Sequence, residues 1–443
     1  MHLGAFFQAT GHHVTSWRHP QADADGGTNI EHQIAIARTA ERGKFDLIFF
    51  ADTLALREAH PEALRRSAQF VSHFDPLMLL AALSSVTKRI GLVATASTSY
   101  NEPFHIARKF SSLDHMSHGR AGWNIVTSAL DYEAHNFSRE GHYEHEDRYE
   151  RAREFTRVVQ GLWDCWEDDA PVHDKESGVF FDLDKVHRLN HKGKYYAVKG
   201  PLNISRSPQG RPVLVQAGAS PAGRGFAAEF ADIIFSTHLT IRESLEFYAE
   251  VKAKAESLGR NPQHLTVLPG LMVVVGRTEA EANEKLEFLQ SLVHPKVALE
   301  ILSMALGGAD LSDYDLDGPL PDLSANVQGS QSSAATVINL ARVQNLTIRQ
   351  LAYRMASARQ RMVVTGSPVQ VADHMEEWFR KGAADGFNVL PPYLPGGLND
   401  FVDLVIPELQ RRGLFRKEYA GTTLREHLGL PRPKASYAKN GQV

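Results

Sequence analysis

The sequence predicts an α/β fold, a (β/α)₈ TIM barrel with long insertions at the face formed by the carboxyl ends of the strands. Eight short segments are near-continuous runs of valine, isoleucine, leucine and phenylalanine, typical of parallel strands covered on both faces. Most are followed by a stretch with the apolar period of a helix, and prolines stand near the first turn of several of these helices. An open doubly wound sheet is the alternative, because a count of strands does not prove that the sheet closes.

The elements alternate along the chain. The predicted strands are His2–Phe7, Phe45–Asp52, Ile90–Thr98, Ala121–Ser128, Val213–Gly218, Asp232–His238, Leu265–Gly276 and Phe387–Pro391. The predicted helices are Ile30–Arg42, Pro76–Lys88, Pro103–Met116, His145–Trp163, Pro221–Ala231, Arg242–Leu258, Glu279–Val293 and Pro368–Lys381, with a further helix at Asp400–Arg412.

We expect a single domain over residues 1–443, because one barrel with insertions reaches this length. The predicted insertions are at about 53–75, 129–144, 166–211 and 293–365, and a C-terminal extension starts at about 398. Loops that follow strands rise from the catalytic face of such barrels.

Composition excludes several classes of protein. The net charge is −4 and no Lys/Arg run is longer than two, so nothing predicts nucleic-acid binding. No apolar stretch approaches the roughly 20 residues of a membrane helix. The single cysteine, Cys165, fits a reducing compartment, and the first residues have no basic n-region. We therefore expect a cytoplasmic protein that binds neither nucleic acid nor membrane.

Polar side chains gather where three successive strands end. Such groups are costly to bury without partners, so together they indicate a ligand rather than loop contacts. The residues are Asp52, Thr95, Ser97, Asn124, Thr127 and Ser128. Taken singly, each has a structural explanation: Asp52 caps a turn, and hydroxyls often line a barrel.

Two helix starts complete the predicted rim. His145 and Tyr149 stand four residues apart, so they share one face at the N-terminal end of a helix, where free N–H groups attract phosphate. We expect both on the cleft side rather than in the packed stripe of that helix. The segment VLVQAGASPAGRGFAAEFAD is a strand, a glycine-rich turn and a helix start, with Ser220 in the turn and Arg224 available to a phosphate. Packing alone explains many such turns.

The sequence does not favour a zinc hydrolase on a barrel. His115 and His118, like His142 and His145, have the spacing HxxH. However, histidines at a helix C-terminus complement the helix dipole without a metal, and the first strand lacks the HxH of zinc barrels. We predict no metal ligands.

Five motifs resemble the bacterial luciferase superfamily of flavin-dependent monooxygenases, in the branch that contains the nitrilotriacetate, long-chain alkane and dibenzothiophene-sulfone monooxygenases. They lie in the expected order over almost the whole chain. These are ERGKFDLIFFAD, LVATASTSYNEPFHIARKFSSLDHMSHGRAGWNIVTS, EHEDRYERAREF, GPLNISRSPQGRPVLVQAGASPAGRGFAAEFAD and FVDLVIPELQRRGLFRKEYAGTTLREHLGL. The resemblance implies that the segment around Ala309–Ser333, within the longest insertion, is a lid. In this region the segment NVQGSQSSAATVINL lacks the histidine-containing lid motif of the sulfone-oxidising members.

The resemblance implies a barrel that binds FMN at the carboxyl end of the strands. The implied positions at the flavin ring and ribityl chain are Asp52, Thr95 and Asn124, and those at the phosphate end are His145, Tyr149 and Ser220. Thr127 and Ser128 are the implied residues near the reactive edge of the flavin.

The implied function is that of a two-component monooxygenase. Reduced FMN comes from a separate NAD(P)H-dependent flavin reductase, and one atom of O₂ enters a small organic substrate, with sulfur- and nitrogen-containing molecules among the options. A homodimer or homotetramer is implied as well. The alternatives are a deazaflavin-dependent oxidoreductase, the zinc hydrolase, and a flavin-binding barrel without catalysis.

Overall fold

Eight parallel strands close into a barrel in the computed structural model, which describes residues 1–128, 130–218, 220–311, 314–321, 331–358 and 362–435. Their order is β1-β2-β3-β4-β9-β10-β11-β13, and β13 pairs with β1 to close the ring. The strands are β1 (His2–Phe7), β2 (Leu47–Phe50), β3 (Gly91–Ser97), β4 (Ala121–Val126), β9 (Val213–Gln216), β10 (Ile233–Ser236), β11 (Thr266–Val275) and β13 (Gly386–Leu390). All eight predicted strands are confirmed, and the open sheet is excluded.

One parallel strand was not predicted. β12 (Met362–Gly366) pairs with the second half of β11, from Leu271 to Val275, and stands outside the barrel ring. Because it is short and lies beside a single neighbour, its apolar run of MVV carries little sequence signal.

Aromatic rings fill the barrel beneath its mouth. Phe6, Phe49 and Phe235 come from β1, β2 and β10, and their ring centroids are 4.6 Å apart in both neighbouring pairs. His12, from the loop after β1, meets Phe6 edge-on at 4.4 Å. The mouth therefore has an apolar floor.

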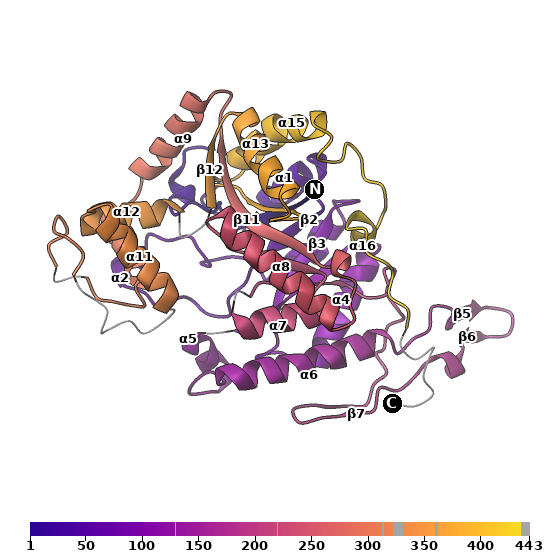
Figure 1. The fold of residues 1–443 in the computed structure, drawn as a ribbon. Coiled ribbons are helices and arrows are strands. Elements are labelled where there is room, and N and C mark those ends of the chain that lie inside the picture. Colours follow the sequence, from indigo (N-terminus) through magenta and orange to yellow (C-terminus); the bar gives the residue numbers. More distant parts are fainter. Residues whose placement is uncertain (129, 219, 312–313, 322–330, 359–361, 436–443) are drawn as a thin grey trace.

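Helices cover the outside of the barrel, and the strands β2, β3 and β11 are visible among them (Figure 1). They are α1 (Ile30–Arg42), α3 (Pro76–Ser84), α4 (Pro103–Met116), α6 (His145–Trp163), α7 (Pro221–Phe230), α8 (Ile241–Ser257), α9 (Glu279–Ser291) and α13 (Pro368–Arg380). Prolines occupy the first turns of α3, α4, α7 and α13, as predicted. Side chains accept N–H groups at several starts, among them Asn29, Asp75 and Ser220.

Two segments stand away from the barrel on opposite sides (Figure 1). Within 166–211 the chain forms two hairpins, β5 (Pro171–Asp174) with β6 (Val179–Phe181), and β7 (His191–Lys192) with β8 (Ala197–Val198). Within 293–365, α10 (Pro295–Ala305), α11 (Gln331–Val343) and α12 (Ile348–Ala358) share a hydrophobic cluster of their own, which Val14 joins. The expected lid at Ala309–Ser333 lies partly outside the described residues.

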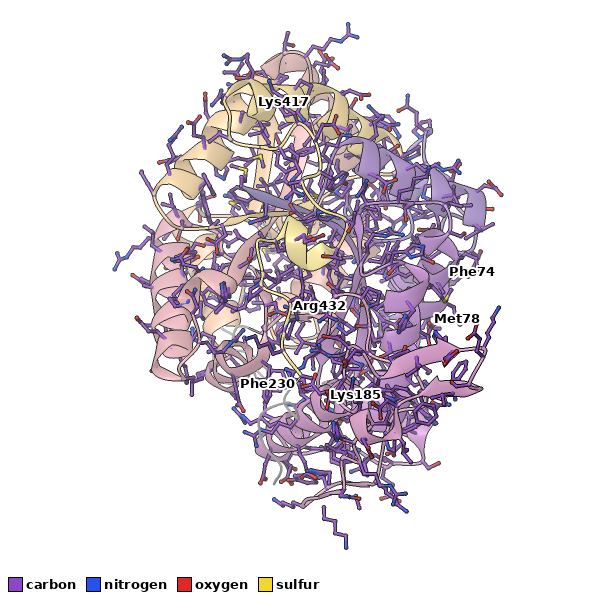
Figure 2. The ribbon with its side chains drawn as sticks, turned by 90° about the vertical axis from the view of Figure 1, so that its right-hand side faces the viewer. Phe74, Met78, Lys185, Phe230, Lys417 and Arg432 are labelled. Carbon is purple, nitrogen blue, oxygen red and sulfur yellow. The ribbon has the colours of Figure 1, made fainter. Side chains whose placement is uncertain are left out.

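A short helix plugs the end of the barrel opposite the mouth. α16 (Leu424–His427) lies at the centre of the ring of helices in Figure 2, and Leu424, Leu428 and Leu430 join the cluster inside the barrel. Before it, the predicted helix Asp400–Arg412 is divided into α14 (Gly396–Asp400), a wide π-turn (Phe401–Val405) and α15 (Ile406–Arg411). Within the described residues, no helix is long and apolar enough to cross a membrane.

Candidate functional site

The structure brings Thr95 and Asn124 together at the mouth of the barrel. They are register partners on β3 and β4, and both are buried. The Asn124 amide donates to Thr95 Oγ1 at 2.9 Å, and the Thr95 hydroxyl donates to the Phe50 carbonyl, also at 2.9 Å. Asn124 Oδ1 is buried without a partner among the described residues.

Asp52 lies two residues beyond β2, half-buried at the same rim. Its pKa is raised to about 6, mainly by burial; His73 acts in the opposite direction, and the nearby carboxylates of Asp75 and Glu133 contribute to the rise. The closest charged contact is His73 Nε2, 4.0 Å from Asp52 Oδ1. A carboxyl with this pKa exchanges its proton near neutral pH, so it is able both to donate and to accept a hydrogen bond.

Ser128 ends the strand earlier than predicted. β4 stops at Val126 because Ser128 has a φ of +46°, in the left-handed region that an extended strand does not enter. Its hydroxyl lies 2.8 Å from Ser97 Oγ. The Thr127 carbonyl accepts from the Ser99 hydroxyl at 2.6 Å. Thr127 and Ser128 therefore form a turn at the rim rather than the end of a strand.

The start of α7 provides a seat for an anion. Ser220 caps this helix and accepts the Gly223 N–H at 3.1 Å, and the first turn carries no acidic residue. A Cβ on Gly223 would stand 3.0 Å from the Tyr149 hydroxyl and 3.2 Å from Gly218 Cα. We call this space, bordered by Ser220, Gly223 and the Tyr149 hydroxyl, the α7 cradle. A side chain at Gly223 would narrow it.

Helix α6 begins at His145 as predicted, but the start of α6 is a poorer anion seat than that of α7. Glu144 stands at its N-cap and Asp147 lies in its first turn. The side chain of His145 is outside the described part of the structure. The Tyr149 side chain is 9% exposed, belongs to the main core cluster and packs against Phe226 at 6.2 Å between ring centroids, so the expectation that it avoids the packed stripe is wrong. Its hydroxyl nevertheless reaches the α7 cradle.

Arg224, which the sequence offered as a partner for a phosphate, forms an ion pair with a carboxylate of α8. Its guanidinium Nε lies 3.1 Å from Glu250 Oε1, on helix α8. Because the charge of Arg224 is paired with Glu250, the groups that remain to bind an anion in the cradle are backbone N–H groups and hydroxyls.

Three rim residues were missed by sequence reasoning. Arg148 Nη1 donates to the Ser128 carbonyl at 2.7 Å, while its Nε is buried without a partner among the described residues. The last residues of β9 and β10, Gln216 and Ser236, are likewise buried with Oε1 and Oγ unpartnered in the described part of the chain. The signal for Arg148 was its place between His145 and Tyr149. For Gln216 and Ser236 the signal in the sequence was a polar residue at the last position of an otherwise apolar strand.

The sequence matches a known protein family. A family model described as luciferase-like monooxygenase covers residues 10–385. The chain belongs to the luciferase-like monooxygenase family.

Members of this flavin-dependent oxidoreductase class are similar to the chain over nearly its full length. The N-acetyl-S-(2-succino)cysteine monooxygenase of Bacillus subtilis (strain 168) is 50% identical over 99% of this chain and 98% of that protein. The nitrilotriacetate monooxygenase component A of Aminobacter aminovorans is also 50% identical, over 99% of this chain and 98% of its own. The crystal structure of a riboflavin lyase with modified FMN and riboflavin superposes with a TM-score of 0.86 at 32% identity, covering 98% of this chain and 97% of that one. The family, the barrel and the enzyme class predicted from the sequence are confirmed.

Histidine, cysteine and carboxylate side chains do not gather into a metal site anywhere in the described ranges, where no group of three or more was found.

Proposed function

We propose that this protein is the oxygenating component of a two-component monooxygenase that uses reduced FMN and O₂. The observation that carries the proposal is the set of buried, unpartnered polar atoms around one mouth. An unsatisfied buried polar group costs about 1–3 kcal/mol, so several at one rim indicate a polar ligand. The atoms are Asn124 Oδ1, Gln216 Oε1, Ser236 Oγ and Arg148 Nε.

The polar groups present fit the parts of FMN: its ring, its ribityl chain and its phosphate. The acceptors Asn124 Oδ1 and Gln216 Oε1 suit ring N–H and ribityl O–H donors, and Arg148 suits an anion. The α7 cradle, with Ser220, Gly223 and Tyr149, suits the phosphate.

Within this proposal the chain binds, orients and keeps water away. Asp52, Thr95 and Asn124 hold the flavin ring and ribityl chain; His145, Tyr149 and Ser220 hold the phosphate end; and Thr127 and Ser128 lie near the reactive edge. The apolar floor of Phe6, Phe49 and Phe235 excludes water from beneath. Bound reduced FMN supplies the electrons that activate O₂.

A partner supplies the reductant. The relative named component A is, by its name, one part of a larger system. Because the sequence has no dinucleotide-binding fingerprint, we assign reduction of FMN to a separate NAD(P)H-dependent flavin reductase.

We further propose a homodimer or homotetramer that associates through α3 and α4. The side chains of Met78 on α3 and Met116 on α4 are 72% and 52% exposed. Met78 lies at the outer edge of the molecule in Figure 2. An exposed apolar helix surface of this kind is typical of subunit contacts.

For the substrate we propose a small molecule in which a carbon that bears a carboxylate group is bonded to nitrogen or sulfur. Both 50%-identical relatives are named for such molecules, one with acetate groups on nitrogen and one with a succino group on sulfur.

The test uses purified protein, FMN and chemically reduced FMN. We expect FMN to bind with changed flavin fluorescence, and oxygen uptake to yield one oxygenated product with a substrate of the proposed class. A protein that binds a deazaflavin but not FMN, or that with reduced FMN and O₂ forms no oxygenated product from substrates of the proposed class, would contradict the proposal.

A further inference from the structure

The loop that follows β4 and the first turns of α6 meet at the carbonyl of Ser128. The left-handed backbone there, φ +46°, is uncommon for a residue with a side chain and persists where neighbouring groups hold it. His142 Nε2 lies 2.9 Å from the Ser128 carbonyl oxygen, and Arg148 Nη1 lies 2.7 Å from the same atom. Two donors occupy both lone pairs of this carbonyl.

His142 is itself fixed on its other side. Its Nδ1 lies 2.6 Å from the Tyr100 hydroxyl, and the Tyr100 ring stacks on Phe137 with 4.5 Å between centroids. A carbonyl oxygen only accepts, so His142 Nε2 carries the hydrogen; in the neutral imidazole Nδ1 then accepts from the Tyr100 hydroxyl. The chain of hydrogen bonds ends at a carbonyl and has no route for a proton. Its effect is to orient the turn.

The side chain of Ser128 faces that of Ser97, with 2.8 Å between their hydroxyl oxygens. Ser97 Oγ also accepts the Ser99 N–H at 3.1 Å. Two hydroxyls carry two hydrogens, and one of them lies between the two oxygens. The pair therefore has one O–H left to donate, whichever of the two serines is the internal donor.

We propose that Tyr100 and His142 are positioning residues that, together with Arg148, hold the Ser97–Ser128 hydroxyl pair so that it donates one hydrogen bond to the reacting oxygen. This inference rests on the proposed function. His142, whose HxxH spacing to His145 had suggested a zinc ligand, thereby has a role as a hydrogen-bond donor.

The chemistry gives a readout that needs no substrate. When no substrate is oxygenated, reduced FMN gives two electrons and two protons to O₂, and the products are oxidised FMN and hydrogen peroxide. With substrate, one oxygen atom enters it and the other leaves as water. Loss of a hydrogen bond to the reacting oxygen speeds the unproductive reaction.

The experiment mixes the full chain, loaded with reduced FMN, with oxygenated buffer and follows both flavin reoxidation and peroxide release. Tyr100→Phe keeps the ring that stacks on Phe137, and His142→Gln keeps an N–H for the Ser128 carbonyl, whereas His142→Ala removes it. The control is His135→Ala, in the same loop, where the imidazole meets only the Glu140 carbonyl at 3.1 Å among the contacts described.

We expect Tyr100→Phe and His142→Ala to reoxidise and release peroxide about fivefold faster than the parent, the factor that corresponds to one ordinary hydrogen bond. His142→Gln returns most of the parent rate, and His135→Ala equals it. Affinity for oxidised FMN and the melting temperature stay unchanged in all four, which a merely structural role would not allow.

Parent-like rates in both Tyr100→Phe and His142→Ala would overturn the positioning role while leaving the proposed function intact. Faster reoxidation accompanied by an equal loss of FMN affinity or melting temperature would overturn it as well. A parent protein that does not bind FMN, or does not react with oxygen when loaded, would remove the proposed function and this inference together.

Discussion

Tyr149→Phe removes one hydroxyl from the cradle at the start of α7 and leaves the packed ring in place. The hydroxyl lies where a Cβ on Gly223 would be 3.0 Å away, whereas the ring packs against Phe226 in the core. One ordinary hydrogen bond is worth about 1 kcal/mol, so the Kd for FMN is expected to rise roughly fivefold. Riboflavin has no phosphate, so its Kd is expected to change by less than about twofold.

Fluorescence titration of both flavins and a melting curve on the same variant check this expectation. Tyr195→Phe is the matched control, because its hydroxyl meets Glu150 Oε2 at 2.9 Å on the exposed surface of α6 and should leave both affinities unchanged. His145→Ala is expected to lose more FMN affinity, roughly 2–3 kcal/mol, as a cationic imidazole against phosphate would. An equal loss for FMN and riboflavin, or a lower melting temperature with FMN affinity intact, would refute the reasoning.

Four further outcomes test separate parts of the proposal. NADH with FMN and protein alone should give no useful reduction, and efficient turnover without a reductase would contradict the assignment of a partner. Gly223→Ala places a methyl 3.0 Å from the Tyr149 hydroxyl, so FMN affinity should fall roughly fivefold with little change in melting temperature. The pKa of Asp52 is raised from 3.8 to about 6, so the folded state keeps a proton that the unfolded chain loses, and the protein loses stability as the pH rises from about 4 to 6. At ~1.36 kcal/mol per pH unit, Asp52→Asn should therefore stabilise the protein by up to ~3 kcal/mol at pH 7. A variant whose melting temperature has the same pH profile as that of the parent would count against this expectation. Sedimentation at micromolar concentration should show an oligomer that Met78→Glu weakens, and a parent monomer would contradict association through α3.

The barrel was predictable because burial on both faces leaves a direct mark on a sequence. Strands such as LIFF in β2 and VLVQ in β9 are apolar almost throughout, and a proline or a capping side chain marks many of the helix starts between them. The division of the last predicted helix had a signal that was overlooked. Pro407 lies in the first turn of α15 and has no N–H for a regular helical bond to the preceding turn, where the π-turn stands.

The site was predictable only as far as strand order determines it. Thr95 and Asn124 are neighbours because β3 and β4 pair in register, and that follows from the barrel. Arg148 reaches the Ser128 carbonyl across a loop, and no local pattern encodes such a reach. Likewise, the period of α6 places Tyr149 on one face of the helix but does not reveal that its ring is buried and that its hydroxyl lies beside Gly223 at the start of α7.

The plug formed by α16 has a consequence for biosynthesis. Every strand of the ring precedes Leu424 in the chain, yet Leu424 and Leu428 complete the apolar cluster inside it. During translation the ring can assemble while its lower opening is still uncovered, and the nascent chain then exposes valine, leucine and phenylalanine side chains to solvent or to a chaperone. A stop codon before residue 424 would thus leave all the residues of the mouth in place and still yield a protein prone to aggregate, detectable as insoluble product.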